Sequence, residues 1–179
     1  MRIISGTAAG RVLRVPKGLA VRPTPDLVKQ ALFNSLGERV VGARVLELFT
    51  GTGALSLECL SRGAASACCI ENSRRHAGFI RRNLGEAHLR PAALEVRVMD
   101  AFAAVAQLRA AGRQFDLILA DPPYGEKNVG HRSTSLAQQL LDDPALPVVL
   151  APGGWLILGH ARRDNLSVPA AWQEAKLLR

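Results

Sequence analysis

From residue 44 onward the chain alternates short apolar runs with segments of helical periodicity, and this alternation constrains the fold more than any other feature. The runs predict strands at Arg44–Phe49, Ser66–Glu71, Leu94–Met99, Phe115–Ala120 and Gly154–His160. The segments between them predict helices over residues 54–62, 73–87, 101–111 and 134–142. Strands and helices that alternate in this way form a parallel sheet with helices on both faces. The predicted fold class is therefore α/β, doubly wound and Rossmann-like.

The residues ahead of this core predict a smaller extension. Two short runs, residues 2–5 and 11–15, flank a glycine-containing turn and are typical of a β-hairpin. Thr24 is placed to cap a helix that has Pro25 at its first position and continues to residue 36. We therefore expect an N-terminal hairpin and helix over residues 1–40 and a core domain over residues 41–179.

The positive charge is concentrated in this extension. The chain carries a net charge of +8, and residues 1–44 contribute 8 basic and 2 acidic side chains. Such an excess favours a polyanionic partner such as nucleic acid over the alternative of a merely solvated basic face. Phosphate contacts are expected from Arg11, Arg14, Lys17 and Arg22.

Other compositional features exclude several classes of protein. Three cysteines are too few to stabilise a chain of 179 residues through disulfide bonds. This count favours reduced thiols and a cytoplasmic protein. The four histidines are scattered, so we expect no metal. No apolar stretch approaches the roughly 18 residues of a membrane span, so we expect no membrane association.

Acidic side chains and glycines follow the first three predicted strands. Gly51 and Gly53 allow a tight turn and close approach of a ligand at the carboxyl end of the first strand. Glu71 ends the second strand, where a carboxylate can accept both ribose hydroxyls, and Asp100 ends the third strand beside the space for an adenine. The alternative interpretation is a tight turn and solvated acids with no ligand. Because the glycines, Glu71 and Asp100 are all expected at one edge of the sheet, a nucleoside-containing cofactor is favoured.

Two residues discriminate between the candidate cofactors. The dinucleotide fingerprint requires a glycine where this chain has Ser56, which disfavours a nicotinamide oxidoreductase. Glu47 precedes the loop, where a carboxylate can interact with a cationic amino-acid group. The sequence therefore favours S-adenosylmethionine. The expected cofactor-binding residues are Glu47, Phe49, Thr50, Gly51, Gly53, Glu71, Asp100, Ala101 and Asp121.

The fourth predicted strand leads into Asp121-Pro122-Pro123-Tyr124, the most specific motif in the chain. The two prolines stiffen the loop, so that Asp121 and a neighbouring carbonyl can accept hydrogens from a planar amine. Tyr124 offers an aromatic face on which a base can stack. These four residues are the candidate catalytic residues, and a rigid turn with a packing tyrosine is the alternative.

At these residues the chain resembles the class I S-adenosylmethionine-dependent methyltransferases. Further segments resemble the RsmD family within that class: Arg2-Ile3-Ile4-Ser5-Gly6, Gly10-Arg11-Val12-Leu13, Arg22-Pro23-Thr24, Ala31-Leu32-Phe33-Asn34 and the run from Gly51 to Glu58. The resemblance implies methylation of the N2 amine of a guanine in 16S ribosomal RNA, within the small subunit or an assembly intermediate, by an enzyme that we expect to be a monomer. It also implies a seven-stranded sheet, whose last strand we expect to be truncated at Arg179. Gln30 departs from the family, which usually has Glu at this position.

Three other functions remain open at this stage. An adenine-amine DNA methyltransferase and a glutamine methyltransferase acting on release factors use related motifs. A DNA enzyme usually needs a separate target-recognition region, for which 179 residues leave little room. A non-catalytic RNA-binding assembly factor would not need the intact motif at Asp121–Tyr124.

Overall fold

The structure is a computed structural model that describes residues 1–15, 25–124 and 132–178. Its strands are β1 (Arg44–Leu48), β2 (Ser66–Glu71), β3 (Leu94–Val98), β4 (Phe115–Ala120) and β5 (Leu150–Leu158). Its α-helices are α1 (Asp26–Leu36), α2 (Ala54–Ser61), α3 (Arg74–Glu86), α4 (Ala101–Ala110), α5 (Leu136–Asp142) and α6 (Leu146–Val149). The strands and helices therefore alternate in the predicted order.

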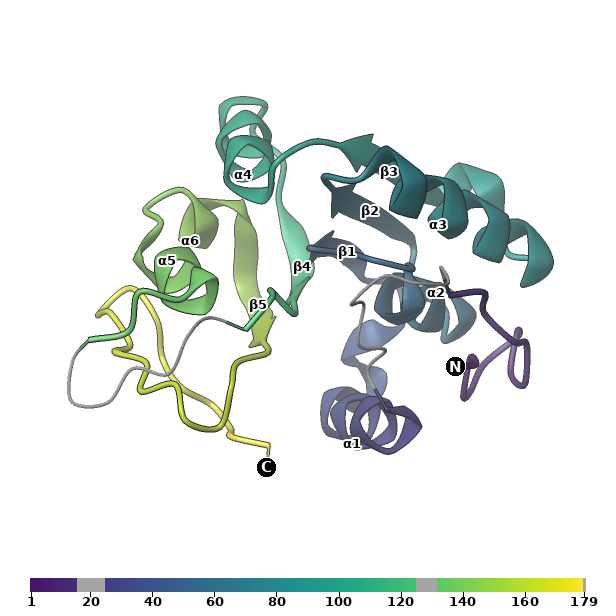
Figure 1. Cartoon of the computed structure of the whole chain (residues 1–179), viewed down its shortest axis with the longest axis horizontal. Coiled ribbons are helices and arrows are strands. Elements are labelled where there is room, and N and C mark those ends of the chain that lie inside the picture. Colours follow the sequence, from purple (N-terminus) through teal and green to yellow (C-terminus); the bar gives the residue numbers. More distant parts are fainter. Residues whose placement is uncertain (16–24, 125–131, 179) are drawn as a thin grey trace.

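All five strands pair in parallel, in the order β3-β2-β1-β4-β5 (Figure 1). The chain steps outward from β1 to β3 and then returns to the other side of β1 with β4. This reversal makes the junction of β1 and β4 the topological switch point, where open α/β sheets bind ligands. The predicted α/β doubly wound fold is confirmed.

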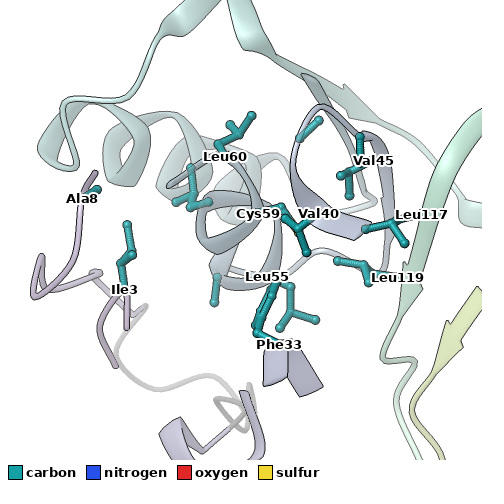
Figure 2. Close-up of a cluster of buried hydrophobic side chains, with 14 of the residues drawn as sticks. Ile3, Ala8, Phe33, Val40, Val45, Leu55, Cys59, Leu60, Leu117 and Leu119 are labelled. Carbon is teal, nitrogen blue, oxygen red and sulfur yellow. The ribbon is translucent and has the colours of Figure 1, made fainter. Parts of the chain in front are cut away.

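Two apolar layers cover the sheet, because alternate residues of each strand face opposite sides. Val45 of β1 and Leu117 of β4 belong to the layer that contains residues of α1, α2, α3 and the N-terminal segment. Leu46 and Ile118 point into the opposite layer, which contains residues of α4, α5 and α6. Figure 2 shows the layer that contains Val45 and Leu117. In this layer, Ile3 lies on the side where α2 packs. The N-terminal segment therefore shares its apolar core with the sheet.

The predicted hairpin forms a single isolated antiparallel bridge, between Arg2 and Val12, rather than two strands. The Ile3 N–H donates to the Arg11 carbonyl, and the Gly10 N–H donates to the Ile3 carbonyl, each at 2.9 Å. Other backbone groups of residues 1–15, which we call the arm, pair with side chains of α2 and α3 instead of extending the ladder. The predicted cap Thr24 lies outside the described residues, and Pro25 occupies the position before α1.

The last strand begins earlier than predicted, at Leu150 rather than Gly154. Its register against β4 shifts between Phe115 and Leu117, and Gly153 has a positive φ of 74°. The glycines and proline in this stretch obscured the beginning of the strand in the sequence. Residues 159–178 form no strand, so the described part of the chain contains five of the seven strands that the resemblance implied.

Candidate active site

The carboxyl ends of the parallel strands bring the predicted site residues to one edge of the sheet. The loop after β1 contains Gly51 and Gly53, Glu71 is the last residue of β2, and Asp100 follows β3. The Asp121–Tyr124 segment follows β4, whose last residue Ala120 pairs with Leu48 of β1. The tetrapeptide and the glycine loop therefore follow neighbouring strands at the switch point.

The loop after β1 turns through left-handed backbone conformations. Gly51 has a φ of 62° and Gly53 a φ of 81°, and Phe49 also adopts a positive φ of 56°. A Cβ on Gly53 would lie 3.0 Å from Cγ2 of Ile80, so this glycine also permits the close approach of α3. The Thr50 hydroxyl donates to the Glu47 carbonyl at 2.9 Å, which anchors the loop to the end of its own strand.

Glu47 caps α2 from the strand that precedes it. The residue before α2 is Gly53, which has no side chain to accept a hydrogen bond from the first turn. Glu47 Oε2 accepts that bond from the Ser56 N–H at 2.9 Å. Burial raises the pKa of the Glu47 carboxyl to about 7, the Ser56 hydrogen bonds oppose the shift, and Asp121 and Glu71 add to it.

Glu71 holds the glycine loop in place. One carboxylate oxygen accepts the Gly51 N–H at 2.8 Å, and the other accepts the Ser73 N–H at 2.8 Å. The His76 ring lies 3.4 Å from the second oxygen. Because a carboxylate oxygen has two lone pairs, Glu71 retains acceptor capacity for hydroxyl groups of a ligand while it fixes the loop.

Asp100 is the N-cap of α4. Its Oδ1 accepts the N–H groups of Phe102 and Ala103, each at 3.0 Å. Ala101 is buried at the first position of the helix. The ring of Phe102 packs edge-to-face on Phe49, with the ring centroids 6.5 Å apart. Phe49, which is expected at the cofactor site, therefore contacts the first turn of α4.

The Asp121–Tyr124 segment packs against the end of β5. The Gly159 N–H donates to the Ala120 carbonyl at 2.7 Å, just before Asp121. A Cβ on Gly159 would lie 2.4 Å from Oδ1 of Asp121, so the carboxylate lies directly over this glycine. Pro122 is buried, whereas Pro123 and Tyr124 are exposed, and 57% of the Tyr124 surface is accessible.

The candidate RNA-binding residues Arg11 and Arg14 lie on the arm. Arg11 and Arg14 are exposed, whereas Ile3 and Leu13 of the same segment are buried. The Arg14 side chain pairs with Glu86 of α3 at 2.6 Å. Lys17 and Arg22 lie outside the described residues.

A buried ionic cluster that the sequence analysis missed attaches the arm to α2. Glu58 accepts the N–H groups of Ile4 at 2.7 Å and Ser5 at 3.0 Å. The Lys29 ammonium lies 3.6 Å from the Glu58 carboxylate and donates to the Arg2 carbonyl. Lys29 and Glu58 are both fully buried. A charged residue inside the apolar α2 sequence is the signal that could have identified this cluster.

A buried amide attaches the arm to both α3 and the glycine loop. The Asn83 side chain accepts the Arg14 N–H at 2.8 Å and donates to the Arg14 carbonyl at 3.1 Å. Its amide nitrogen also donates to the Thr52 carbonyl at 3.0 Å. Asn83 therefore joins the arm and the loop after β1 through a single side chain.

Within residues 1–15, 25–124 and 132–178, no group of three or more His, Cys, Asp or Glu residues could hold a metal ion. In the same part of the chain, no helix has both the length and the apolar character to cross a membrane.

Comparison with known protein sequences identifies relatives. The model of the family described as "Conserved hypothetical protein 95" matches residues 1–176. The chain is 32% identical to the putative rRNA methyltransferase YlbH of Bacillus subtilis over 166 residues, which cover 93% of this chain and 85% of that protein. It is 40% identical to ribosomal RNA small subunit methyltransferase D of Escherichia coli over 124 residues, which cover 69% of this chain and 60% of that protein.

Comparison with solved structures identifies similar folds over most of the chain. The hypothetical protein TTHA0928 of Thermus thermophilus superposes with a TM-score of 0.77 and 27% identity, covering 93% of this chain and 89% of that chain. The putative methyltransferase yhhF of Escherichia coli superposes with a TM-score of 0.72 and 31% identity, covering 98% and 90%.

Proposed function

Because the chain belongs to the RsmD family, described as "Conserved hypothetical protein 95", we propose that it methylates the N2 amine of a guanine in 16S ribosomal RNA. The family match confirms the resemblance inferred from the sequence motifs. The observation that carries the proposal is the position of Asp121–Tyr124 after β4, beside the glycine loop that follows β1. This position supports the proposal, because it brings the proposed amine-binding motif next to a candidate cofactor site.

The edge of the sheet fits S-adenosylmethionine as the cofactor. Gly51 and Gly53 allow a ligand to approach the loop backbone closely, and Glu71 retains acceptor capacity for ribose hydroxyls. Glu47 is the candidate partner of the cationic amino-acid group, and Asp100 the candidate neighbour of the adenine. The remaining proposed cofactor-binding residues are Phe49, Thr50, Ala101 and Asp121.

The proposed chemistry is mainly positioning. S-adenosylmethionine supplies an electrophilic methyl group. The exocyclic amine of guanine is a poor nucleophile, because its lone pair is delocalised into the ring. Asp121 and the Pro122 carbonyl accept the amine hydrogens and orient the lone pair, while Tyr124 stacks on the extruded base. Pro122 and Pro123 keep this segment stiff.

The arm and α1 form the proposed RNA-contacting extension, residues 1–40, of the methyltransferase domain over residues 41–179. Arg11 and Arg14 are exposed on the arm and can contact phosphates, as we also propose for Lys17 and Arg22. The proposed substrate is 16S ribosomal RNA in the small subunit or an assembly intermediate. The proposed enzyme acts as a cytoplasmic monomer.

Methyl transfer from labelled S-adenosylmethionine tests the proposal. The protein is incubated with undermethylated small-subunit RNA, both free and in particles, and the product is digested to nucleosides. We expect the label in N2-methylguanosine, and we expect Asp121→Ala to lower turnover by orders of magnitude while it lowers the affinity for S-adenosylmethionine much less. Label in adenine or in protein glutamine would support one of the other amino-methyltransferase functions. RNA binding without transfer would indicate an assembly factor.

A further inference from the structure

Helix α3 and the turn after it form a second cationic segment. Residues 74–90 contain five arginines and one acidic residue, Glu86. This segment carries a net charge of +4, half of the net charge of the whole chain. Residues 45–179 taken together carry a net charge of only +2, because acidic residues elsewhere offset this segment.

The arginines of α3 lie on its outer face. The face that packs on the core contains Ala77, Ile80, Asn83 and Leu84, which are all buried. The exposed residues of the helix include Arg74, Arg75, Arg81 and Arg82, and Arg81 also donates to the Val96 carbonyl of β3 at 3.4 Å. The Arg82 guanidinium lies over the Phe79 ring, 5.8 Å from its centroid. The outer face therefore combines positive charge with an aromatic ring, two features that occur together in RNA-binding surfaces.

The arm continues this face at the C-terminal end of α3. Arg14 pairs with Glu86 through its side chain, and with Asn83 through its backbone N–H and carbonyl. Arg82 and Glu86 are four residues apart and hence neighbours on the helix surface. Glu86 thus pairs with Arg14 and is also a surface neighbour of Arg82, so that a single carboxylate is close to two arginines.

The other end of α3 begins at the candidate active site. The helix starts at Arg74, three residues after Glu71, and its 13 residues span about 20 Å. Arg75 and Arg82 are seven residues apart and share one side of the helix. A cationic strip thus runs from the arm, along α3, to the carboxyl edge of the sheet.

We propose that the arm and the outer face of α3 form one RNA-binding surface, which holds the phosphate backbone of the substrate along α3. This inference rests on the proposed function, since it assigns the surface to the same substrate. RNA fits this face better than a membrane does, because a helix that lies on a bilayer inserts its apolar side. The apolar side of α3 is buried in the core, and no large hydrophobic residue of α3 is among the highly exposed residues in the described chain.

Alanine variants of the helix arginines test the proposal. Binding of small-subunit RNA is measured at several salt concentrations for the wild type, Arg81→Ala/Arg82→Ala and Arg109→Ala. Alanine preserves helix propensity, so the variants should fold. Arg109 is the matched control, because it is an exposed arginine on α4, which covers the other face of the sheet. We expect the plot of log affinity against log salt to flatten by about two units for the double variant. We expect the control to match the wild type.

A combined variant tests whether the two parts form one surface. Adding Arg11→Ala to the double variant should flatten the slope further, by about one unit. An unchanged slope in Arg81→Ala/Arg82→Ala, or an equal loss in Arg109→Ala, would overturn the proposal. Labelled methyl transfer is measured on the same samples. Transfer to guanine with unchanged slopes overturns only the α3 surface, whereas flattened slopes without transfer leave that surface intact and contradict the proposed activity.

Discussion

Gly159 and Asp121 lie so close together that a Cβ on Gly159 would come within 2.4 Å of the Asp121 carboxylate. Gly159→Ala should therefore displace the Asp121 carboxylate, the proposed amine-binding group, without removing it. We expect turnover to fall by orders of magnitude while the affinity for S-adenosylmethionine changes little. Single-turnover kinetics and calorimetric titration measure the two effects. The matched control is Gly85→Ala, since this residue is helical, has no positive φ, and a Cβ there meets nothing within 4 Å. Normal turnover in Gly159→Ala would contradict this role of the contact.

Tyr124 is exposed at the end of the Asp121–Tyr124 segment, so its removal should leave the core intact. We expect Tyr124→Ala to weaken productive RNA engagement by about 1–3 kcal/mol, the value of one base–aromatic stack. Tyr124→Phe keeps the ring and should retain most of that interaction. The KM for RNA measures the effect. Equal losses in the two variants would assign the effect to the hydroxyl instead of the ring.

Glu71 connects the glycine loop to the start of α3 through two backbone hydrogen bonds. Glu71→Ala should weaken S-adenosylmethionine binding, since each lost charge-assisted bond to a ribose hydroxyl is worth about 1.5–3 kcal/mol. Calorimetric titration measures the affinity, and the thermal unfolding temperature monitors the loop. Glu71→Gln retains one acceptor oxygen and should lose less affinity. Unchanged affinity in Glu71→Ala would rule out the ribose assignment.

Burial raises the pKa of Glu47 to about 7, which makes the stability of the cofactor-free protein depend on pH. Between the unfolded pKa of 4.5 and this value, the folded state binds the extra proton. The contribution of Glu47 to the free energy of unfolding therefore falls as pH rises through that window. The shift corresponds to about 3 kcal/mol.

Glu47→Gln removes this titration and keeps an oxygen for the Ser56 N–H. The stability of the variant relative to the wild type should increase between pH 5 and pH 7 and then level off. Denaturant unfolding at several pH values measures the difference. A difference that is independent of pH would show that Glu47 keeps its ordinary pKa.

Lys29 is a fully buried cation that lies against Glu58. Lys29→Met breaks this buried ion pair but leaves Glu58 paired with Arg62 at 2.8 Å, so we expect the free energy of unfolding to fall by about 3 kcal/mol, the lower end of the usual range. The adjacent exposed Gln30 provides the control, and Gln30→Met should change stability by less than about 0.5 kcal/mol. Urea unfolding measures both variants. A small loss in Lys29→Met would mean that Arg62 and the arm backbone compensate Glu58 by themselves.

The sequence was sufficient to predict the order of strands and helices and the edge of the sheet where the site residues meet. Local signals carry this information, because apolar runs with period two or with helical period identify the elements. The carboxyl ends of parallel strands must then share one edge. Glu71, for example, was predicted to end the second strand, and it does.

Only the tertiary structure revealed how the arm is attached. The Ile4 N–H reaches Glu58 across 54 residues of sequence, and the Arg14 N–H reaches Asn83 across 69. Sequence periodicity does not indicate such pairs, because each pair depends on which backbone groups become buried when the chain folds. A buried N–H needs a hydrogen-bond acceptor, and that acceptor can come from a distant part of the sequence. The predicted hairpin therefore became an arm with a single bridge, which hydrogen bonds to α1, α2 and α3 attach to the core.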